Sequence, residues 1–320
     1  MDALRRVRAS LPSNARVTVP AVHHFDTAVH VIIMDDARGT MPLKAALLNG
    51  RIAPPRAAAL GADLGAFLRA LHARGQVDEV LREALGAHTW AREVSAFVTY
   101  GRLGATLRAP GGEGDAGTGT GATTMTTRDM EVVSVLGEEP LGVSEDTLRV
   151  VESLAERRVA QIRGGEQSRD ETFVMGDFWP GNVLVRQDDA EGEEEEVQVM
   201  VVDWEVARLG LAGLDVGQFC AELATVRQLR PERAEAAGEV LKSFVRAYFA
   251  GDVGPEADER RRVAVGHFGV HLAVWTPRTG WNAGPEATRA VVLNGVARLA
   301  AGADADRIWT DEELVQNFMS

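Results

Sequence analysis

Residues 175–182 read Met-Gly-Asp-Phe-Trp-Pro-Gly-Asn, and residues 203–205 read Asp-Trp-Glu. Asp177 and Asn182 are five positions apart in the first stretch, where Pro and Gly favour a bent loop. Asp203 opens the second stretch, directly after a run of apolar residues that is typical of a short strand. Two carboxylates and an amide in this pattern indicate a polar site at the end of a sheet.

The apolar runs 182–185 and 199–203 predict two short strands. The acidic segment 188–196 between them is expected to be the solvated tip of a hairpin. Pairing of the two strands would return Asp203 to the side of Asn182. The sequence therefore predicts that these two side chains face one pocket.

Phosphoryl transfer needs a group that orients the attacking hydroxyl and oxygen ligands that hold Mg²⁺ against the phosphates of ATP. Asp177 fits the first role, as the catalytic base, and Asn182 and Asp203 fit the second, as metal ligands. Each residue also has a structural interpretation, because Asp and Asn are common in caps and turns and an Asp can end a strand. The joint spacing favours the catalytic interpretation.

The remainder of the chain predicts an α+β fold rather than an alternating βαβ fold. Residues 2–9 have the pattern of a short helix, and residues 17–22 and 29–34 that of two strands around a turn at 25–27. Helical patterns then follow in the segments 60–71, 76–107, 144–163 and 215–302, the last interrupted near 276–280.

Residues 109–127 are rich in Gly and Thr and are expected to form a low-complexity insertion. This stretch contains a Gly-x-Gly-x-x-Gly pattern at 112–117. The pattern neither follows a predicted strand nor opens a predicted helix, which argues against a phosphate-binding loop.

The 320 residues carry a formal net charge of −13, which argues against a nucleic-acid partner. Cys220 is the single cysteine, so no intramolecular disulfide can form and a reducing compartment is expected. The N-terminus lacks the apolar run of a signal peptide, and no apolar run reaches the length of a membrane span. We therefore expect a cytoplasmic protein without a membrane partner, and the sequence carries no signal for its oligomeric state.

Residues 173–185 and 202–205 together resemble the aminoglycoside phosphotransferase and choline kinase-like family, with the Phe-Trp-Pro-Gly-Asn stretch most similar to fungal members. The likeness covers roughly residues 17–300 and is most specific between 173 and 219. It implies a protein kinase-like fold with a mostly helical C-terminal lobe that carries the catalytic hairpin. It also implies ATP- and Mg²⁺-dependent transfer of phosphate to a hydroxyl of a small molecule.

The resemblance implies further roles for individual residues. Residues 31–36 correspond to the strand and hinge over which adenine lies, so Met34, Asp35 and Ala37 are the expected nucleotide-binding positions. Asp215 corresponds to the aspartate at the start of the next helix, where it is expected to cap that helix and to hydrogen-bond the catalytic loop.

The family's N-terminal lobe also supplies a strand lysine that anchors phosphates. This chain has two lysines, Lys44 after the expected hinge and Lys242 in a late helix, and neither is at that position. We therefore expect residues 1–36 to be a remnant of the N-terminal lobe and hinge, and residues 37–320 to be the C-terminal lobe. Two alternatives stay open: a catalytically impaired pseudo-kinase or binding module, and a truncated gene product.

Several other residues could serve either a site or the core. His23 and His24 are adjacent and would point to opposite faces of a strand, which argues against a shared metal. Trp275 and Trp281 could line the acceptor cleft or belong to the core, and Cys220 is expected to be buried rather than reactive. The histidines expected to pack or to line a pocket are His72, His267 and His271.

Overall fold

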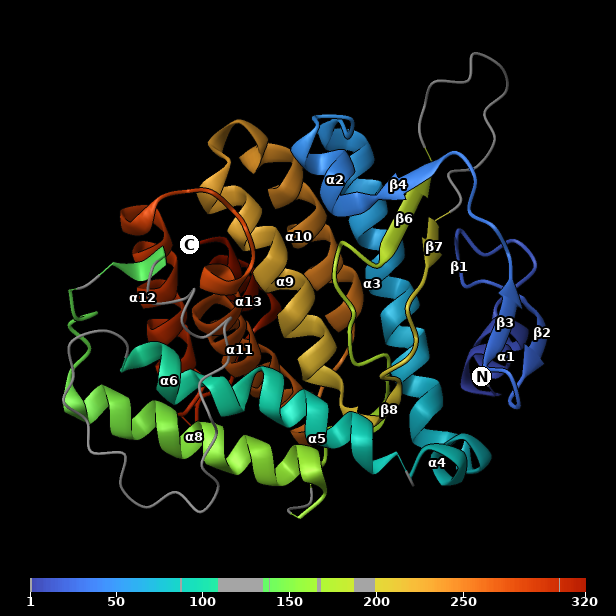
Figure 1. The fold of residues 1–320 in the computed structure, drawn as a ribbon, viewed down its shortest axis with the longest axis horizontal. Helices are drawn as coiled ribbons and strands as arrows, with labels where there is room; N and C mark the ends of the chain where they lie inside the picture. The colour runs from blue at the N-terminus through green and yellow to red at the C-terminus, as the bar shows by residue number, and fades with distance from the viewer. Residues whose placement is uncertain are drawn as a thin grey trace.

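The computed structural model describes residues 2–86, 88–108, 135–137, 139–165, 168–186, 199–304 and 306–320. Helices dominate these residues, and short strands lie toward the end that carries the N-terminus, so the expected α+β class is confirmed (Figure 1). The helices are α1 Asp2–Ser10, α2 Leu43–Leu48, α3 Pro54–Val77, α4 Glu79–Gly86, α5 Thr89–Val98, α6 Leu103–Leu107, α8 Glu145–Arg163, α9 Ala212–Leu229, α10 Ala234–Phe249, α11 Pro255–Trp275, α12 Pro285–Ala301 and α13 Asp311–Met319. Short 3₁₀ turns are η1 Tyr100–Arg102, η2 Pro231–Arg233 and η3 Thr276–Arg278. The strands are β1 Val17–Thr18, β2 Val22–Asp26, β3 Val31–Met34, β4 Thr40–Pro42, β5 Glu171–Val174, β6 Val183–Arg186, β7 Val199–Val201 and β8 Arg208–Leu211.

The N-terminal region contains the expected short helix, α1, followed by a separate hairpin of β2 and β3. Two expectations are wrong in detail here. The single strand expected at 17–22 is divided into β1 and β2, because Pro20 has no N–H to continue the pairing. The turn expected at 25–27 lies at 27–30 instead, since the Asp26 carboxylate accepts two backbone N–H groups of that turn.

The predicted hairpin of β6 and β7 is confirmed as the centre of a four-stranded sheet in the order β1-β7-β6-β4. β1 pairs parallel to β7, and β4 pairs antiparallel to β6. The strand β4 was not predicted, because three residues are too few for alternation to reveal a strand.

The two faces of this sheet differ in burial. One face is formed by buried valines of β1, β6 and β7, which pack into the core: Val17, Val183, Val185, Val199 and Val201. On the other face the strand registers place Thr18, Met200, Leu184 and Pro42 in one row across the sheet. These residues are half-buried or exposed, so this face is less buried than the valine face, and Thr18 and Met200 line a hollow together with Asp35.

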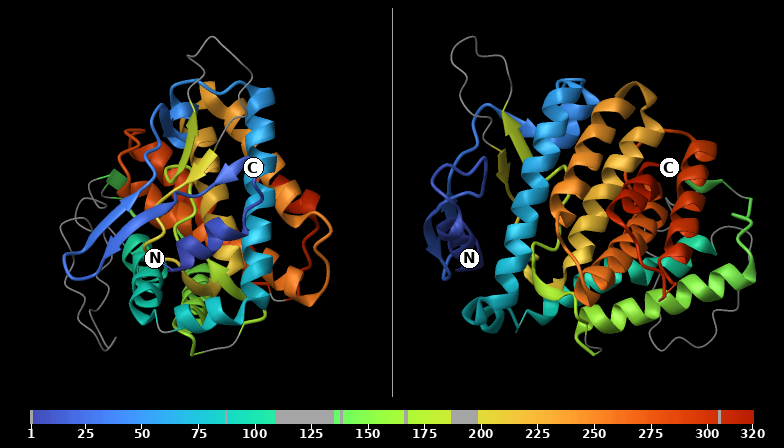
Figure 2. Two further views of the ribbon diagram at one scale, coloured as in Figure 1. Left: turned by 90° about the vertical axis from the view of Figure 1, so that its right-hand side faces the viewer. Right: turned by 180° about the vertical axis from the view of Figure 1, so that it is seen from behind.

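The long helix α3 lies against α10, and the right-hand view of Figure 2 shows the two side by side. Pro54 occupies the first turn of α3, where its missing N–H has no helical partner to lose. Gly61 and Gly65 allow the close approach, because a Cβ there would lie 2.2 Å from the Val240 carbonyl oxygen and 2.4 Å from that of Phe244, respectively. This contact fixes the helical platform that carries the site.

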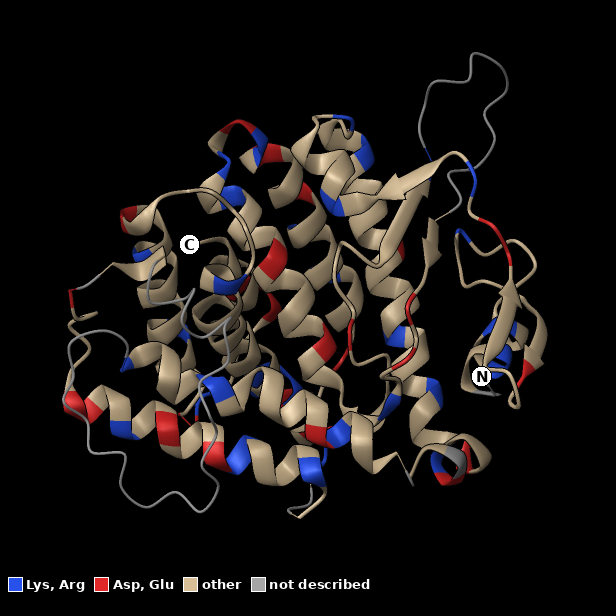
Figure 3. Ribbon diagram, viewed as in Figure 1, with Lys and Arg blue, Asp and Glu red and all other residues tan. Residues whose placement is uncertain are grey.

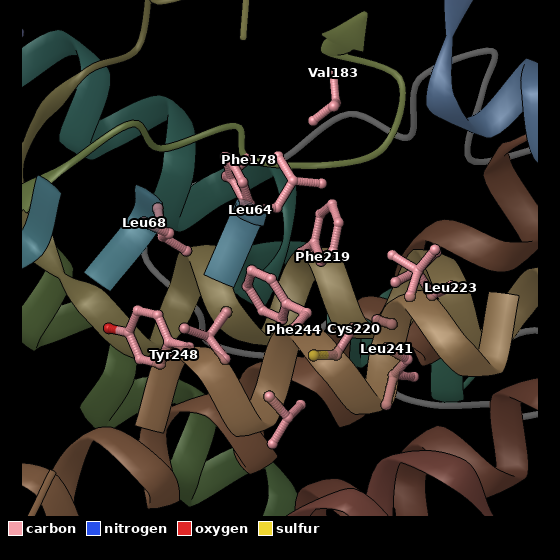
Figure 4. Close-up of a cluster of buried hydrophobic side chains, with 14 of the residues drawn as sticks. Leu64, Leu68, Phe178, Val183, Phe219, Cys220, Leu223, Leu241, Phe244 and Tyr248 are labelled. Carbon is pink, nitrogen blue, oxygen red and sulfur yellow. The ribbon is translucent and has the colours of Figure 1, made fainter. Parts of the chain in front are cut away.

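The helical predictions for 60–71, 144–163 and 215–302 are confirmed by α3, α8 and the succession from α9 to α12. Cys220 is buried in α9 as expected, among the apolar side chains shown in Figure 4. Two strands in this half were not predicted: β5 and β8, which pair antiparallel and precede the loop 175–182 and α9, respectively.

Charges are mixed on the described surface, as the alternating blue and red segments along α8 show in Figure 3. None of the described helices is long and apolar enough to cross a membrane. The predicted insertion 109–127, with its glycine pattern at 112–117, and the acidic segment 188–196 lie outside the described residues.

Candidate functional site

The loop from residue 175 to residue 182 connects β5 to β6 and is held on both sides of Asp177. Gly176 has a φ of 84°, and a Cβ there would lie 2.6 Å from a backbone carbonyl oxygen in the turn before β8. Phe178 points into the core, where its ring centroid is 5.1 Å from that of Phe219 (Figure 4). Asp177 is therefore presented between a backbone constraint and an aromatic anchor.

Each carboxylate oxygen of Asp177 accepts a hydrogen bond from a side-chain amide. Gln218 Nε2, from α9, donates to Oδ1 at 2.6 Å. Asn182 Nδ2 donates to Oδ2 at 3.0 Å and to the Asp177 carbonyl oxygen at 3.0 Å. Both donors are uncharged, so they fix the direction of the carboxylate without neutralising it.

The pKa of Asp177 is raised above the ordinary aspartate value. Burial is the largest cause, and the negative charge of Asp203 acts in the same direction. The hydrogen bonds from Gln218 and Asn182 oppose this shift, because they stabilise the ionised form. A raised pKa brings the carboxylate closer to the range in which a general base works well.

Asp203 lies directly beyond β7, close enough to Asp177 for the two charges to interact. The N–H of Val202 donates to the Asn182 carbonyl oxygen at 2.9 Å, which ties the two halves of the hairpin together beside the site. Asp203 has a φ of 68°, a left-handed conformation that Asp tolerates better than most residues. Its carboxylate is exposed and makes no hydrogen bond or ion pair with any residue that the structure describes.

Asn182 and Asp203 fit a magnesium ion by the chemistry of their free atoms. Asn182 uses its amide nitrogen toward Asp177, which leaves its oxygen, and Asp203 has two uncommitted oxygens. In the described ranges no three His, Cys, Asp or Glu side chains gather as a metal site. A cation here would need further oxygen ligands from water and nucleotide phosphates, which is typical of Mg²⁺.

Asp215 hydrogen-bonds the loop 175–182, as the resemblance implied. Its Oδ2 accepts the Met175 N–H at 2.8 Å, and its Oδ1 accepts the Gly176 N–H at 2.9 Å. The expected capping role is wrong, because Asp215 lies inside the first turn of α9. The carboxylate of Asp170 instead accepts the Gly213 N–H at the start of that helix, at 2.8 Å.

His72 and His267 are buried, as expected for packing residues. His72 lies between Asp215, at 3.2 Å from Nε2, and the Tyr248 hydroxyl, at 2.7 Å from Nδ1. His267 Nδ1 lies 3.1 Å from the Tyr100 hydroxyl. Burial lowers the pKa of both histidines, which favours their neutral forms.

The expected nucleotide-binding residues Met34, Asp35 and Ala37 lie at the end of β3 and directly after it. Met34 ends the strand, and the Asp35 N–H donates to the Ala21 carbonyl oxygen at 3.0 Å. The Asp35 carboxylate accepts the Ala21 N–H at 2.8 Å and lies 2.7 Å from His23 Nε2. The Asp35 N–H is therefore occupied, whereas its carbonyl oxygen and the Ala37 N–H have no hydrogen-bond partner among the described residues.

A cavity of about 230 Å³ opens beside the Asp177 carboxylate. Residues from α5, α9 and α11 and from the turn before β8 line it, among them Val98, Asp177, Glu205, Gln218, His267 and Trp275. Trp275 therefore belongs to this cavity, whereas Trp281 is buried and packs with the core.

Gln218 is the residue of this arrangement that sequence reasoning missed. The sequence around Asp215 predicts a contact between the start of α9 and the loop 175–182, but it assigns no role to Gln218. A signal was present, because a residue three positions after Asp215 lies on the same helical face. That face was expected to meet the catalytic loop.

A family model described as the phosphotransferase enzyme family matches residues 1–262. The chain belongs to this family. Its predominant helices, the hairpin of β6 and β7 and its short N-terminal strands accordingly form a protein kinase-like α+β fold.

Two relatives of this chain come from species of Psilocybe. The chain is 23% identical over 272 residues to a 4-hydroxytryptamine kinase of Psilocybe cyanescens, a match that covers 84% of this chain and 63% of that protein. It is 26% identical over 129 residues to a 4-hydroxytryptamine kinase of Psilocybe cubensis, which covers 40% of this chain and 33% of that protein. The chain thus spans less than two thirds of the length of either relative.

Similar solved structures include a choline/ethanolamine kinase family protein from Mesorhizobium loti, at 16% identity and a TM-score of 0.42, with 99% of this chain and 82% of that chain covered. An ethanolamine kinase of Plasmodium vivax has 13% identity and a TM-score of 0.43, with 94% of this chain and 70% of that chain covered.

Proposed function

We propose that this chain carries the metal- and acceptor-binding part of an ATP- and Mg²⁺-dependent phosphotransferase that acts on a hydroxyl of a small molecule. The observation that carries the proposal is the arrangement around Asp177. Its carboxylate is held by Asn182 and Gln218, it interacts with the charge of Asp203, and it borders a cavity. Phosphoryl transfer needs this combination of a directed base and nearby oxygen ligands.

In this proposal Asp177 accepts the proton of the acceptor hydroxyl as that oxygen attacks the terminal phosphorus of ATP. The bond from this phosphorus to the bridging oxygen breaks, and ADP leaves with the bond's electron pair. The amides of Asn182 and Gln218 keep the carboxylate in one direction, which lowers the entropy lost on reaching the reactive geometry. Asn182 and Asp203 hold Mg²⁺, which would neutralise charge on the phosphates when bound. The raised pKa of Asp177 fits a base that must be ionised yet able to take a proton.

The proposed nucleotide site lies between the hinge and the face of the four-stranded sheet that carries Leu184 and Met200. The Asp35 carbonyl oxygen and the Ala37 N–H supply one acceptor and one donor beside Met34, which suits the edge of an adenine ring. Met200 and Leu184 supply an apolar floor next to the strand that ends at the metal site. These features support binding of ATP at this face.

The proposed acceptor site is the cavity beside Asp177. Val94, Val98 and Trp275 give it apolar walls, and Glu205 adds a second carboxylate. Such a lining suits an acceptor with an apolar or aromatic body and a cationic group. Because two relatives are named 4-hydroxytryptamine kinases, that compound is the first acceptor to test.

A second candidate function is supported by the lysines. Lys44 Nζ is bonded to Glu222 at 2.8 Å, and Lys242 Nζ to Glu239 at 2.5 Å. Neither lysine is free to anchor phosphates beside the hinge. A pseudo-kinase or binding module with weak nucleotide affinity is therefore the alternative.

The proposed division of the chain assigns residues 1–36 to the N-terminal lobe and hinge and residues 37–320 to the C-terminal lobe. We propose a cytoplasmic location, because the single cysteine, Cys220, is buried and unpaired, which suits a reducing compartment.

Transfer of radiolabelled phosphate from ATP to a panel of hydroxyl compounds tests the proposed function. The panel contains 4-hydroxytryptamine, choline and ethanolamine. We expect a labelled product with at least one acceptor, in a reaction that requires Mg²⁺ and stops when EDTA removes it. Absence of transfer to every acceptor, together with undetectable binding of Mg²⁺-ATP, would favour the binding module instead.

Replacing Gln218 by leucine should move the acidic limb of the pH–activity profile to higher pH by roughly one unit. A shift of this size corresponds to the free energy of about one hydrogen bond to a charged group. The lost hydrogen bond had lowered the pKa of Asp177, so the carboxylate of the variant takes up a proton at higher pH. The measurement is kcat/KM against pH. Gln228→Leu, farther along α9, is the matched control, and an unchanged profile for Gln218→Leu would contradict the assignment.

A further inference from the structure

Lys44, in the short helix α2, holds its ammonium group in a site made of two indole rings and a carboxylate. Nζ lies 4.2 Å from the ring centroid of Trp281 and 5.1 Å from that of Trp179. It also lies 2.8 Å from Glu222 Oε2. The side chain of Lys44 is 19% exposed and that of Glu222 is 7% exposed, so water screens this ion pair little. Two tryptophan faces and a carboxylate are strong partners for an alkylammonium ion.

The carboxylate of this site is held at both of its oxygens. Glu222 Oε1 lies 3.0 Å from Nε2 of His271, a buried residue of α11. Burial opposes ionisation of Glu222, but the hydrogen bonds and charges of His271 and Lys44 outweigh it and lower the pKa of Glu222 to about 2. Glu222 therefore stays ionised at neutral pH and links α2, α9 and α11.

The same lysine contacts the catalytic loop through its backbone and through Trp179. The Lys44 N–H donates to the Pro180 carbonyl oxygen at 3.0 Å. The Trp179 ring packs so closely on Gly181 that a Cβ there would lie 2.2 Å from it. Trp179 is thus fixed between the loop backbone and the ammonium group of Lys44, two positions after Asp177.

The two residues of α9 that connect to the loop are about one helical turn apart. Gln218, which directs the Asp177 carboxylate, and Glu222, which binds Lys44, are separated by four positions on the same helix. The loop is therefore connected to one face of α9 at two points, directly through Asp177 and indirectly through Trp179 and Lys44.

We propose that Lys44 is a positioning residue whose ammonium group, bound by Trp179, Trp281 and Glu222, holds the catalytic loop in the geometry that directs Asp177. This role rests on the proposed phosphotransferase function. It assigns a role to Lys44, which lies in α2 and therefore cannot be the phosphate-anchoring strand lysine of the N-terminal lobe.

The test truncates Lys44 to alanine and returns the lost group as a free ion. We expect Lys44→Ala to lower kcat by roughly tenfold to 100-fold, as small displacements of a catalytic group do, with KM for ATP nearly unchanged. The n-propylammonium ion matches the atoms removed and should restore kcat in a saturable manner. The neutral 1-propanol should not. Lys242→Ala removes the other lysine, whose partner Glu239 lies on the same helix, and should leave activity unchanged.

Full activity of Lys44→Ala, or equal rescue by 1-propanol, would overturn the proposal. If Lys44→Ala fails to fold because Glu222 is left buried and unpaired, the double variant Lys44→Met/Glu222→Gln removes both charges together. This pair should fold and show the same loss of kcat, and full activity would again overturn the role.

A readout without catalysis separates this proposal from the proposed function. In spectra of protein with ¹⁵N-labelled tryptophan, n-propylammonium should shift the indole signals of Trp179 and Trp281 saturably in Lys44→Ala and leave them unchanged in the wild type. If the wild type transfers no phosphate, the proposed function fails, and these spectra still decide whether the ammonium site exists. Absence of any saturable shift would contradict the site itself.

Discussion

Replacing Asp177 by asparagine should lower the rate of phosphoryl transfer by about 10²- to 10⁴-fold, the contribution typical of a positioned general base. Asparagine keeps the shape of the side chain and can still accept one hydrogen bond from Gln218 or Asn182, so the loop should keep its conformation. It cannot take up the proton of the acceptor hydroxyl. The measurement is kcat at saturating ATP and acceptor, with the Michaelis constants recorded alongside.

The Michaelis constant for ATP should change little in Asp177→Asn, because Asp177 is placed toward the acceptor cavity rather than the hinge. Asp146→Asn is the matched control, since this aspartate lies exposed on α8 away from the site. An Asp177→Asn variant that retains more than about a tenth of the wild-type kcat would contradict the assignment of the base.

Replacing Asp203 by asparagine should lower turnover at least about 100-fold at physiological Mg²⁺ and raise the Mg²⁺ concentration needed for half-maximal rate. The reason is the loss of the exposed carboxylate that has no partner in the described part of the chain. Asparagine tolerates the left-handed φ of 68° at this position, so the backbone should stay in place. The measurement is the initial rate of transfer over a series of Mg²⁺ concentrations.

The same substitution removes a negative charge beside Asp177 and should therefore lower the pKa of that carboxylate, which the Asp203 charge helps to raise. The pH profile and the Mg²⁺ requirement together therefore distinguish two effects of Asp203→Asn, the loss of a charge beside Asp177 and the loss of a metal ligand. Loss of charge alone would shift the acidic limb of the pH profile downward without changing the Mg²⁺ requirement. That outcome, with near-normal turnover, would refute the role of Asp203 as a ligand.

The hairpin of β6 and β7 could be predicted from the sequence because its signals are local. The spacing of Asp177 and Asn182 and the apolar run before Asp203 lie within short stretches, and the hairpin that joins them is confirmed. The long helices were also accessible, because an apolar face repeats many times along α3 and α8. Roles for the three polar residues stay predictions until they are measured.

Features that depend on distant partners were not accessible from local patterns. The strands β4, β5 and β8 have three or four residues each. They are strands only because β4 pairs with β6 and because β5 and β8 pair with each other. The contact of Gln218 with Asp177 joins residues 41 positions apart, and that of Lys44 with Glu222 joins residues 178 positions apart. The sequence indicates the first pair only indirectly, because Gln218 lies on the same helical face as Asp215, and no spacing rule connects the second pair.

Calorimetric titration of Mg²⁺-ATP into the wild-type chain tests the central claim, that Asn182, Asp203 and the hinge form a metal-dependent nucleotide site. We expect saturable binding with a submillimolar Kd, within the range of roughly 1 μM to 1 mM that is ordinary for substrates. Binding in the millimolar range would favour the binding module instead. We also expect that binding is lost when EDTA replaces Mg²⁺ and is strongly weakened in Asp203→Asn. Undetectable binding by the wild type, or binding of equal strength without Mg²⁺ and in Asp203→Asn, would contradict the central claim.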